Sequence, residues 1–240
     1  MIDIHTHIIP GIDDGAEDYE EAFAMLDKAS KNGTGTVVLT PHYPNKRFGF
    51  EKSADEYFEF IKTAAEKLSH GQNKVRLFTG AEMYCDPNTV NLIDNGEVIT
   101  LGDTRFVLIE FSADCHFAFI ESAVNRLKDR SYRPVIAHAE RYLCLQYDFE
   151  RVDRLKESGC VIQTNVETVL GKNNRNAVKL GNYMLENRLV DIVASDAHGV
   201  FYRSPDMSAA DAEAAYRCSP QYADRLFRTN PMKLLNGENI

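Results

Sequence analysis

Met1-Ile-Asp-Ile-His5-Thr-His7 opens the chain and joins a short apolar run to two histidines two residues apart. Residues i and i+2 of a strand share a face, so His5 and His7 are expected to point together toward the mouth of a barrel. Ile2 and Ile4 would then pack outward on helices. Two imidazoles on one face suit a divalent metal. Taken alone, however, the motif fits two ordinary histidines near a frayed terminus better, because His-x-His often occurs by accident.

Six further apolar runs follow and alternate with helical patterns, which is typical of βα units around a parallel sheet. Each run is rich in Val, Ile, Leu or Phe, as strands buried on both faces should be. The sequence therefore predicts an α/β fold, a TIM-like (β/α)7 barrel. The expected strands are Met1–His5, Thr36–Thr40, Val75–Thr79, Arg105–Phe111, Pro134–Ala137, Val161–Asn165 and Val190–Ser195.

Amphipathic segments lie between these runs. In Asp18–Lys31, apolar residues recur at helical spacing before Gly33, which can end the helix. Ser53-Ala-Asp-Glu56 has the capping-box pattern, so another helix is expected to begin there. Further helices are expected at Phe117–Arg130, Phe149–Ser158, Asn174–Glu186, Ser208–Arg217 and Gln221–Arg228.

Length and composition limit the class of protein. The chain has 240 residues, 44% of them apolar, and no segment that looks like a linker, so we expect one domain over residues 1–240. The sequence has no long apolar run and no signal peptide, which predicts a cytoplasmic protein without membrane insertion. The formal net charge of −9 argues against a nucleic-acid partner, which would need a basic face.

The five cysteines are scattered and form no Cys-x-x-Cys pair, so neither a disulfide framework nor a zinc knuckle is predicted. Cysteine-dependent phosphatases use a Cys-x5-Arg loop, which the sequence lacks. The nearest approach is Cys218, with six residues between it and Arg225. The cysteines are therefore interpreted as reduced and mostly structural.

The residues that end the apolar runs are biased toward metal-binding types. In (β/α) barrels the active site lies at the C-terminal ends of the strands, so these side chains are expected to meet. Glu110 is the strongest single signal, because an ionised carboxylate within an apolar run is rarely buried unless it is paired or metal-bound. The set comprises His5, His7, His42, Glu82, Glu110, His138, Asp196 and His198.

Several members of this set have an ordinary structural explanation. Asp196 also fits a helix N-cap, and a lone His42 or His138 is more often a hydrogen-bonded core residue. Asp13–Gly15 reads as a tight turn. The argument for a site is coincidence, because eight potential ligands at the ends of six strands are not expected from independent accidents.

Together these motifs resemble the polymerase-and-histidinol-phosphatase (PHP) superfamily, and within it the bacterial protein-tyrosine phosphatases of capsule and exopolysaccharide synthesis, the CpsB/YwqE type. The resemblance spans nearly the whole chain and implies a distorted seven-stranded PHP barrel. It rests on residues 1–7 and on Asp13-Asp-Gly15, Thr40-Pro-His42, Gly80-Ala-Glu82, Ile109-Glu-Phe111, Ile136-Ala-His-Ala-Glu-Arg141, Val193-Ala-Ser-Asp-Ala-His198 and Asn230-Pro231.

The resemblance also implies three divalent metal ions. These are usually manganese, although mixed nitrogen and oxygen ligands also suit iron or zinc. The implied ligands are His5, His7, Glu82 and Asp196 for the first ion; Glu82, as a bridge, with Glu110 and His138 for the second; and Asp14, His42 and His198 for the third.

Arg141 and Arg203 match arginines that hold the phosphate in this family, and a solvated surface arginine is the alternative for each. No role is assigned to the loop Tyr43–Phe50, which includes Lys46 and Arg47.

The hypothesis for the reaction is in-line attack on phosphorus by a metal-bridging hydroxide, without a covalent protein intermediate. The implied substrate is a phosphotyrosine protein, a bacterial tyrosine autokinase of the polysaccharide export machinery.

Two other functions are compatible with the same cluster. One is a small-molecule phosphoesterase such as a histidinol phosphatase. The other is a catalytically inactive, metal-bound regulatory module. Asp14 and Glu110 are histidine in some other branches of the superfamily, so these residues and the Ala139-Glu-Arg141 signature favour the tyrosine phosphatase.

Overall fold

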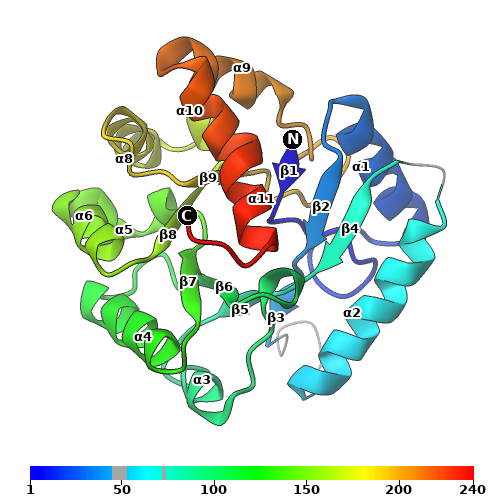
Figure 1. Cartoon of the computed structure of the whole chain (residues 1–240), viewed down its shortest axis with the longest axis horizontal. Helices are drawn as coiled ribbons and strands as arrows, with labels where there is room; N and C mark the ends of the chain where they lie inside the picture. Colours follow the sequence, from blue (N-terminus) through cyan, green and yellow to red (C-terminus); the bar gives the residue numbers. More distant parts are fainter. Residues whose placement is uncertain (45–52, 72–73) are drawn as a thin grey trace.

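The structure is a computed structural model that describes residues 1–44, 53–71 and 74–240. Its strands curl around a common centre, and helices surround them on the outside (Figure 1). All strand pairings among the described residues are parallel, in the orders β1-β2-β4 and β3-β5-β6-β7-β8-β9. The strands are β1 (Ile2–Asp3), β2 (Thr36–Leu39), β3 (His42–Tyr43), β4 (Arg76–Thr79), β5 (Glu82–Tyr84), β6 (Phe106–Glu110), β7 (Arg133–Ile136), β8 (Val161–Asn165) and β9 (Ile192–Ala194).

Backbone hydrogen bonds extend the strand pairing beyond the ends of the strands, and one of them joins the two groups. Between β2 and the turn that follows β4, the Gly80 amide donates to the carbonyl of Leu39 at 2.9 Å. Beyond β1 and β9, the His7 amide donates to the carbonyl of Ala197, also at 2.9 Å. The result is an α/β fold with a curled parallel sheet, in which the first and last strands approach each other beside the two N-terminal histidines.

Each of the seven predicted apolar runs overlaps a strand, although the bounds agree at both ends only for Val161–Asn165. The sequence does not predict β3 and β5, because each has at most three residues and begins with a polar residue. Short strands of this kind have no alternating pattern to recognise.

The two faces of the sheet bury different clusters of apolar side chains. Val107 and Ile109 of β6 pack with residues of the surrounding helices, whereas Phe106 and Leu108 belong to a separate interior cluster. Ile2 and Ile4 also lie in the interior cluster, so their predicted outward packing is wrong. Ile4 and the adjacent His5 both lie inside, so the strand alternation breaks between them, just after β1 ends at Asp3.

The predicted helices are present, and the capping box at Ser53 is confirmed. The expected helix Gln221–Arg228 is instead a helix, α10, followed by a π-helical turn at Arg225–Thr229. Single 3-10 turns lie at Leu101–Asp103 and Ala139–Arg141. The α-helices are α1 (Tyr19–Lys31), α2 (Ala54–Ser69), α3 (Asn91–Asn95), α4 (Phe117–Asp129), α5 (Leu143–Tyr147), α6 (Glu150–Glu157), α7 (Val166–Val169), α8 (Arg175–Glu186), α9 (Ser208–Arg217), α10 (Pro220–Asp224) and α11 (Asn230–Leu235).

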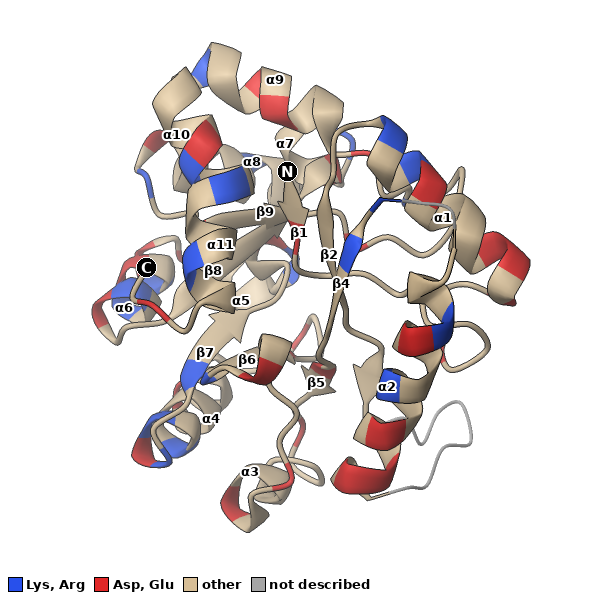
Figure 2. Ribbon diagram, turned by 45° about the vertical axis from the view of Figure 1, so that its right-hand side comes forward, with Lys and Arg blue, Asp and Glu red and all other residues tan. Residues whose placement is uncertain are grey.

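Charged residues of both signs are interspersed on the outer helices, for example on α1, α4 and α9 (Figure 2). This is the usual pattern of solvated helix faces. Among the described helices, none combines the length and the apolar character needed to cross a bilayer.

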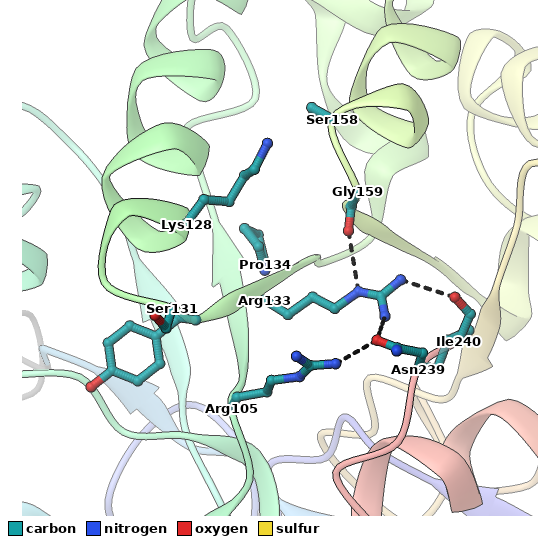
Figure 3. Close-up of a pocket in the computed structure, with 10 residues that line it drawn as sticks. Arg105, Lys128, Ser131, Arg133, Pro134, Ser158, Gly159, Asn239 and Ile240 are labelled. Atoms are coloured by element: carbon teal, nitrogen blue, oxygen red, sulfur yellow. Dashed lines mark hydrogen bonds between the residues drawn. The ribbon is translucent and has the colours of Figure 1, made fainter.

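The last residues of the chain are attached at the N-terminal ends of β6 and β7 (Figure 3). Arg133 donates to the carbonyl of Gly159 at 3.2 Å, to Asn239 Oδ1 at 3.1 Å and to the backbone oxygen of Ile240 at 2.9 Å. Arg105 donates to the same oxygen of Asn239. Arginine side chains therefore hold this end of the sheet by hydrogen bonds to backbone and amide oxygens. The predicted ligands lie at the opposite, C-terminal ends of the strands.

Candidate metal centre

The structure brings together all nine predicted ligands at the C-terminal ends of the strands. Most of them follow a strand or end it, His42 and Glu82 begin the short strands β3 and β5, and Asp14 lies in the loop before α1. A cavity of about 780 Å³ opens above them, and His5 and His7 lie fully buried beneath it. The cavity is lined by seven of the nine residues, namely Asp14, His42, Glu82, Glu110, His138, Asp196 and His198, together with Arg141 and Arg203.

Four side chains form the deepest group. The Nε2 atoms of His5 and His7 are 3.3 Å apart. Glu82 Oε2 lies 3.2 and 3.3 Å from these two nitrogens, and Asp196 Oδ1 lies 3.4 and 3.5 Å from them. Ligand atoms about 2.0–2.2 Å from a tetrahedral ion would be about 3.3–3.6 Å apart. The spacing of His5, His7 and Asp196 therefore fits one divalent ion, and an oxygen of Glu82 lies beside both imidazoles.

Glu82 also faces a second group. Its Oε1 lies 2.8 Å from His138 Nε2, and its Oε2 lies 3.1 Å from His42 Nδ1. Glu110 completes this group, with one oxygen 3.0 Å from His42 Nδ1 and the other 3.5 Å from His138 Nε2. Glu82 thus lies between two sets of ligand atoms, which is the position of a bridging carboxylate.

The third group lies nearest the solvent. Asp14 Oδ1 is 3.4 Å from His42 Nε2 and 3.3 Å from His198 Nε2. Nitrogen and oxygen atoms of His7, Asp14, His42 and His198 all come within 4.8 Å of one another. The two nitrogens of His42 therefore face different groups, which the sequence alone does not reveal.

The geometry around one buried atom suits a metal ion better than a hydrogen bond. His42 Nδ1 is buried and makes no hydrogen bond, although carboxylate oxygens of Glu82 and Glu110 lie within 3.1 Å of it. A buried polar atom without a partner is unfavourable. A cation bound between the nitrogen and the oxygens would satisfy all three atoms, so these residues fit a metal.

Electrostatics within the cluster favour added positive charge. Burial disfavours the charged form of Glu82, but the charges of His5 and His42 outweigh it and hold the pKa of this carboxyl well below its usual range. Burial also opposes charge on His138, yet its hydrogen bonds to Glu110 and Glu82 raise the pKa of the imidazole to about 9. The carboxylates are thus ionised and stabilised by neighbouring positive charge, which bound divalent ions can supply in place of protons.

Several residues outside the predicted set position the ligands. Asp13 Oδ2 lies 2.7 Å from His7 Nδ1, which leaves Nε2 free to face the cluster. Asp13 also accepts from the amide of Gly15 at 3.0 Å, and a Cβ at Gly15 would lie only 1.9 Å from the carbonyl oxygen of His7. The Asp-Asp-Gly turn therefore has two functions, because Asp13 orients an imidazole and Asp14 joins the cluster.

Strand β8 provides two further positioning residues. Gln163 Oε1 lies 3.2 Å from His5 Nδ1, and Asn165 donates to Asp196 Oδ2 at 2.8 Å. Both side chains are buried, although they follow the apolar residues Val161 and Ile162 that begin the strand. The signal in the sequence is two amides at spacing i, i+2 at the C-terminal end of a predicted strand, where apolar residues would be expected.

Arg141 and Arg203 lie at the edge of the cavity, and both contact Asp196. Arg141 Nη2 is 2.9 Å from Asp196 Oδ2, and Arg203 forms an ion pair with the same oxygen. Both arginines are partly exposed, so their remaining N–H groups can donate to a phosphate in the cavity. Asp196 and Arg203 have positive φ angles of 53° and 45°, and residues held in this region concentrate at functional sites.

Glu140 fixes the turn that presents Arg141. Its carboxylate accepts hydrogen bonds from the Thr164 hydroxyl at 2.6 Å, the backbone N–H of Asn165 at 2.9 Å and the Thr168 hydroxyl at 2.9 Å. This buried carboxylate explains the Ala-Glu-Arg sequence in physical terms. Of the unassigned loop Tyr43–Phe50, residues 45–50, with Lys46 and Arg47, lie outside the described residues, and Pro44 lines the cavity.

The comparisons with known proteins agree with this geometry. Residues 1–236 match the model of the family described as capsular polysaccharide synthesis, CpsB/CapC. The chain is 32% identical over 245 residues to the tyrosine-protein phosphatase CpsB of Streptococcus pneumoniae, with both chains covered completely. It is 30% identical over 208 residues to the tyrosine-protein phosphatase YwqE of Bacillus subtilis, which covers 85% of this chain and 80% of that protein.

A solved structure is similar over the entire chain. It comes from a study of YwqE from Bacillus subtilis and CpsB from Streptococcus pneumoniae, described there as unique metal-dependent tyrosine phosphatases. The TM-score is 0.90 at 27% sequence identity, covering 100% of this chain and 96% of the other. On the strength of the family match and of these full-length relatives, the chain belongs to the CpsB/CapC family of capsular polysaccharide synthesis.

Proposed function

We propose that this protein is a metal-dependent protein-tyrosine phosphatase that hydrolyses phosphotyrosine in a protein of capsule or exopolysaccharide synthesis. The observation that carries the proposal is the cluster of imidazole and carboxylate atoms beneath a cavity edged by Arg141 and Arg203. The named relatives are tyrosine-protein phosphatases, and the similarity to them extends along the whole chain.

The finer description of the fold is part of the same proposal. We take the curled sheet to be a distorted (β/α)7 barrel of the PHP type, in which β2 with β3 and β4 with β5 each form one interrupted strand. The hydrogen bonds from Gly80 to Leu39 and from His7 to Ala197 support this description, because they continue the pairing across the interruptions. One domain over residues 1–240 accords with the family match over residues 1–236.

We assign three divalent ions to the cluster, with manganese as the expected metal and iron or zinc as alternatives. Glu82 would bridge the first two ions, and its position between two groups of ligand atoms supports this role. The other ligands would be His5, His7 and Asp196 for the first ion; Glu110 and His138 for the second; and Asp14, His42 and His198 for the third.

When bound, the divalent ions would supply a water of lowered pKa as nucleophile and positive charge against the phosphate oxygens. The arginines of the chain then have a separate task. Arg141 and Arg203 hold the phosphate from one side of the cavity, and their shared contact with Asp196 fixes both guanidinium groups relative to the cluster. Holding the reacting groups in place is a large part of catalysis in phosphoryl transfer.

No cysteine lines the cavity among the described residues. Burial raises the pKa of the Cys85 thiol to about 12, which keeps it protonated near neutral pH. A cysteine nucleophile is therefore not part of the proposal. Replacing all five cysteines by serine should leave phosphotyrosine hydrolysis intact, and loss of turnover in folded, metal-loaded protein would contradict this.

We propose a bacterial tyrosine autokinase of polysaccharide export as the physiological substrate. The family's place in capsular polysaccharide synthesis supports this choice. The test compares turnover of a phosphotyrosyl peptide with that of histidinol phosphate by the metal-loaded protein. A clear preference for the peptide is expected. Preference for histidinol phosphate would make the protein a small-molecule phosphoesterase, and failure to cleave any aryl phosphate would make it a regulatory module.

A further inference from the structure

The loop after β9 carries two exposed aromatic side chains that the proposed reaction does not use. Phe201 is 93% exposed and Tyr202 is 79% exposed. Scattered exposed apolar residues are normal, whereas adjacent large ones beside a polar cavity are typical of binding surfaces. Their position relative to the cavity therefore decides whether they have a function.

The ends of this loop lie in the candidate metal centre. The His198 amide donates to the carbonyl of Arg203 at 2.9 Å, which closes the loop and leaves Phe201 and Tyr202 at its tip. Lys28 of α1 holds the tip, because its Nζ donates to the Val200 carbonyl at 2.6 Å and lies 5.5 Å from the centre of the Phe201 ring. The loop tip and the Phe201 ring are thus held beside the mouth of the cavity, with Tyr202 next to them in the chain.

A second pocket of about 410 Å³ adjoins the main cavity under this loop. Phe201 and Tyr202 line it together with Glu21 of α1. Asp14, His198 and Arg203 line both the pocket and the main cavity, so the two spaces border the same side chains. A phosphate ester held by Arg203 would have part of its alcohol group beside the pocket.

We infer that Phe201 and Tyr202 bind the polypeptide next to the phosphotyrosine, and that the adjoining pocket takes an apolar side chain of that segment. This rests on the proposed phosphatase function and deepens it, because it distinguishes a protein substrate from free phosphotyrosine. The aromatic rings supply rigid apolar contact area at little cost in side-chain entropy. Glu21 on the same pocket would repel an acidic neighbour, and the two aromatic rings would favour an apolar one.

The experiment compares three substrates that share one leaving group: free O-phosphotyrosine, a phosphotyrosyl peptide flanked by leucines, and the same peptide flanked by aspartates. The enzyme is the full-length, metal-loaded protein, either unchanged or with Phe201→Ala and Tyr202→Ala combined. Tyr216→Ala is the matched control, because Tyr216 is 88% exposed on α9 and lines neither space. Metal content and thermal unfolding show whether each variant is intact.

The unchanged enzyme should have a higher kcat/KM for the leucine peptide than for the aspartate peptide or free phosphotyrosine. In the double variant, the ratio of kcat/KM for the leucine peptide to that for free phosphotyrosine should fall about tenfold, mainly because KM for the peptide rises. Tyr216→Ala should leave the preference unchanged. If the double variant keeps the same preference for the leucine peptide as the unchanged enzyme, the inference is wrong. Hydrolysis of free phosphotyrosine would still support the proposed function in that case. The inference is also wrong if the unchanged enzyme is a dimer, the double variant is a monomer and the substrate preference is the same in both. Phe201 and Tyr202 would then contact a second copy of the chain. If the unchanged enzyme hydrolyses none of the three substrates, the proposed function itself fails.

Discussion

The two ends of the strands are held together in opposite ways. At the C-terminal ends, ionisable side chains such as His5, Glu82 and Asp196 are buried against one another. At the N-terminal ends, hydrogen bonds attach later parts of the chain: Arg133 donates to Asn239 Oδ1, and Tyr222 Oη of α10 donates to the carbonyl of Val190 at 2.8 Å. Bound cations would complete the first arrangement, whereas the second consists of hydrogen bonds within the chain. Function and stability are therefore expected to separate between the two ends.

The largest effect should come from the carboxylate that faces two ligand groups. Glu82→Gln removes a negative charge shared by His5, His7, His42 and His138, so it should reduce metal content and lower kcat/KM for an aryl phosphate by about 10³-fold or more. Steady-state kinetics and elemental analysis measure both. Glu66→Gln on the exposed face of α2 is the control and should change neither. Full activity in Glu82→Gln would contradict the bridging role.

A smaller effect is expected at the edge of the same end. Arg203→Lys keeps the charge but loses the planar pair of donors, so KM for phosphotyrosine should rise about 10-fold to 100-fold with metal content unchanged. The exposed Arg225 provides a matched Arg→Lys control. If Arg203→Lys loses metal instead of substrate affinity, the arginine supports Asp196 rather than phosphate.

The opposite end should respond in stability rather than in activity. Arg133→Ala removes hydrogen bonds to Gly159, Asn239 and Ile240, which should lower the free energy of unfolding by about 1–2 kcal/mol. Chemical denaturation measures this change, and kcat per bound metal should stay the same. A large loss of kcat in folded, metal-loaded Arg133→Ala would show that the two ends are coupled.

The smallest effect concerns the alkaline limit of stability. Burial raises the pKa of the Tyr222 phenol, so the unfolded chain loses this proton first as pH rises above about 10. The unfolded state then binds fewer protons than the folded state, and stability falls with rising pH. At pH 8, Tyr222→Phe should lower the free energy of unfolding by about 1 kcal/mol, because the hydrogen bond to Val190 is lost. Between pH 8 and pH 11, the free energy of unfolding should fall less in this variant than in the unchanged protein. The prediction is wrong if the free energy of unfolding falls by the same amount in both proteins between pH 8 and pH 11.

Much of the fold was accessible from the sequence because buried strands leave a strong apolar signal. Val161–Asn165 is predicted to the residue, and each of the other predicted runs overlaps a strand. The failures have a common cause. β3 and β5 are too short to show a pattern, and the packing of Ile2 and Ile4 depends on where β1 ends, which is a matter of tertiary pairing.

The candidate site divides in the same way. Glu110 and the two N-terminal histidines are conspicuous because charged or imidazole side chains follow apolar runs. Gln163 and Asn165 are not, since amides are rarely ligands and their task is to orient His5 and Asp196. Asp13 is hidden in a turn whose residues have an ordinary local explanation. The phosphate-binding roles of Arg141 and Arg203 rest on family resemblance, because an arginine in a loop has no local signature.

The central claim is that the C-terminal ends of the strands form a metal-dependent site for phosphotyrosine. The most direct measurement determines the metal content of the purified protein by elemental analysis while following its hydrolysis of a phosphotyrosyl peptide before chelation, after chelation and after return of the metal. We predict close to three divalent ions per chain, loss of turnover on chelation and recovery on reloading. Turnover that persists in protein shown to be free of metal would contradict the account.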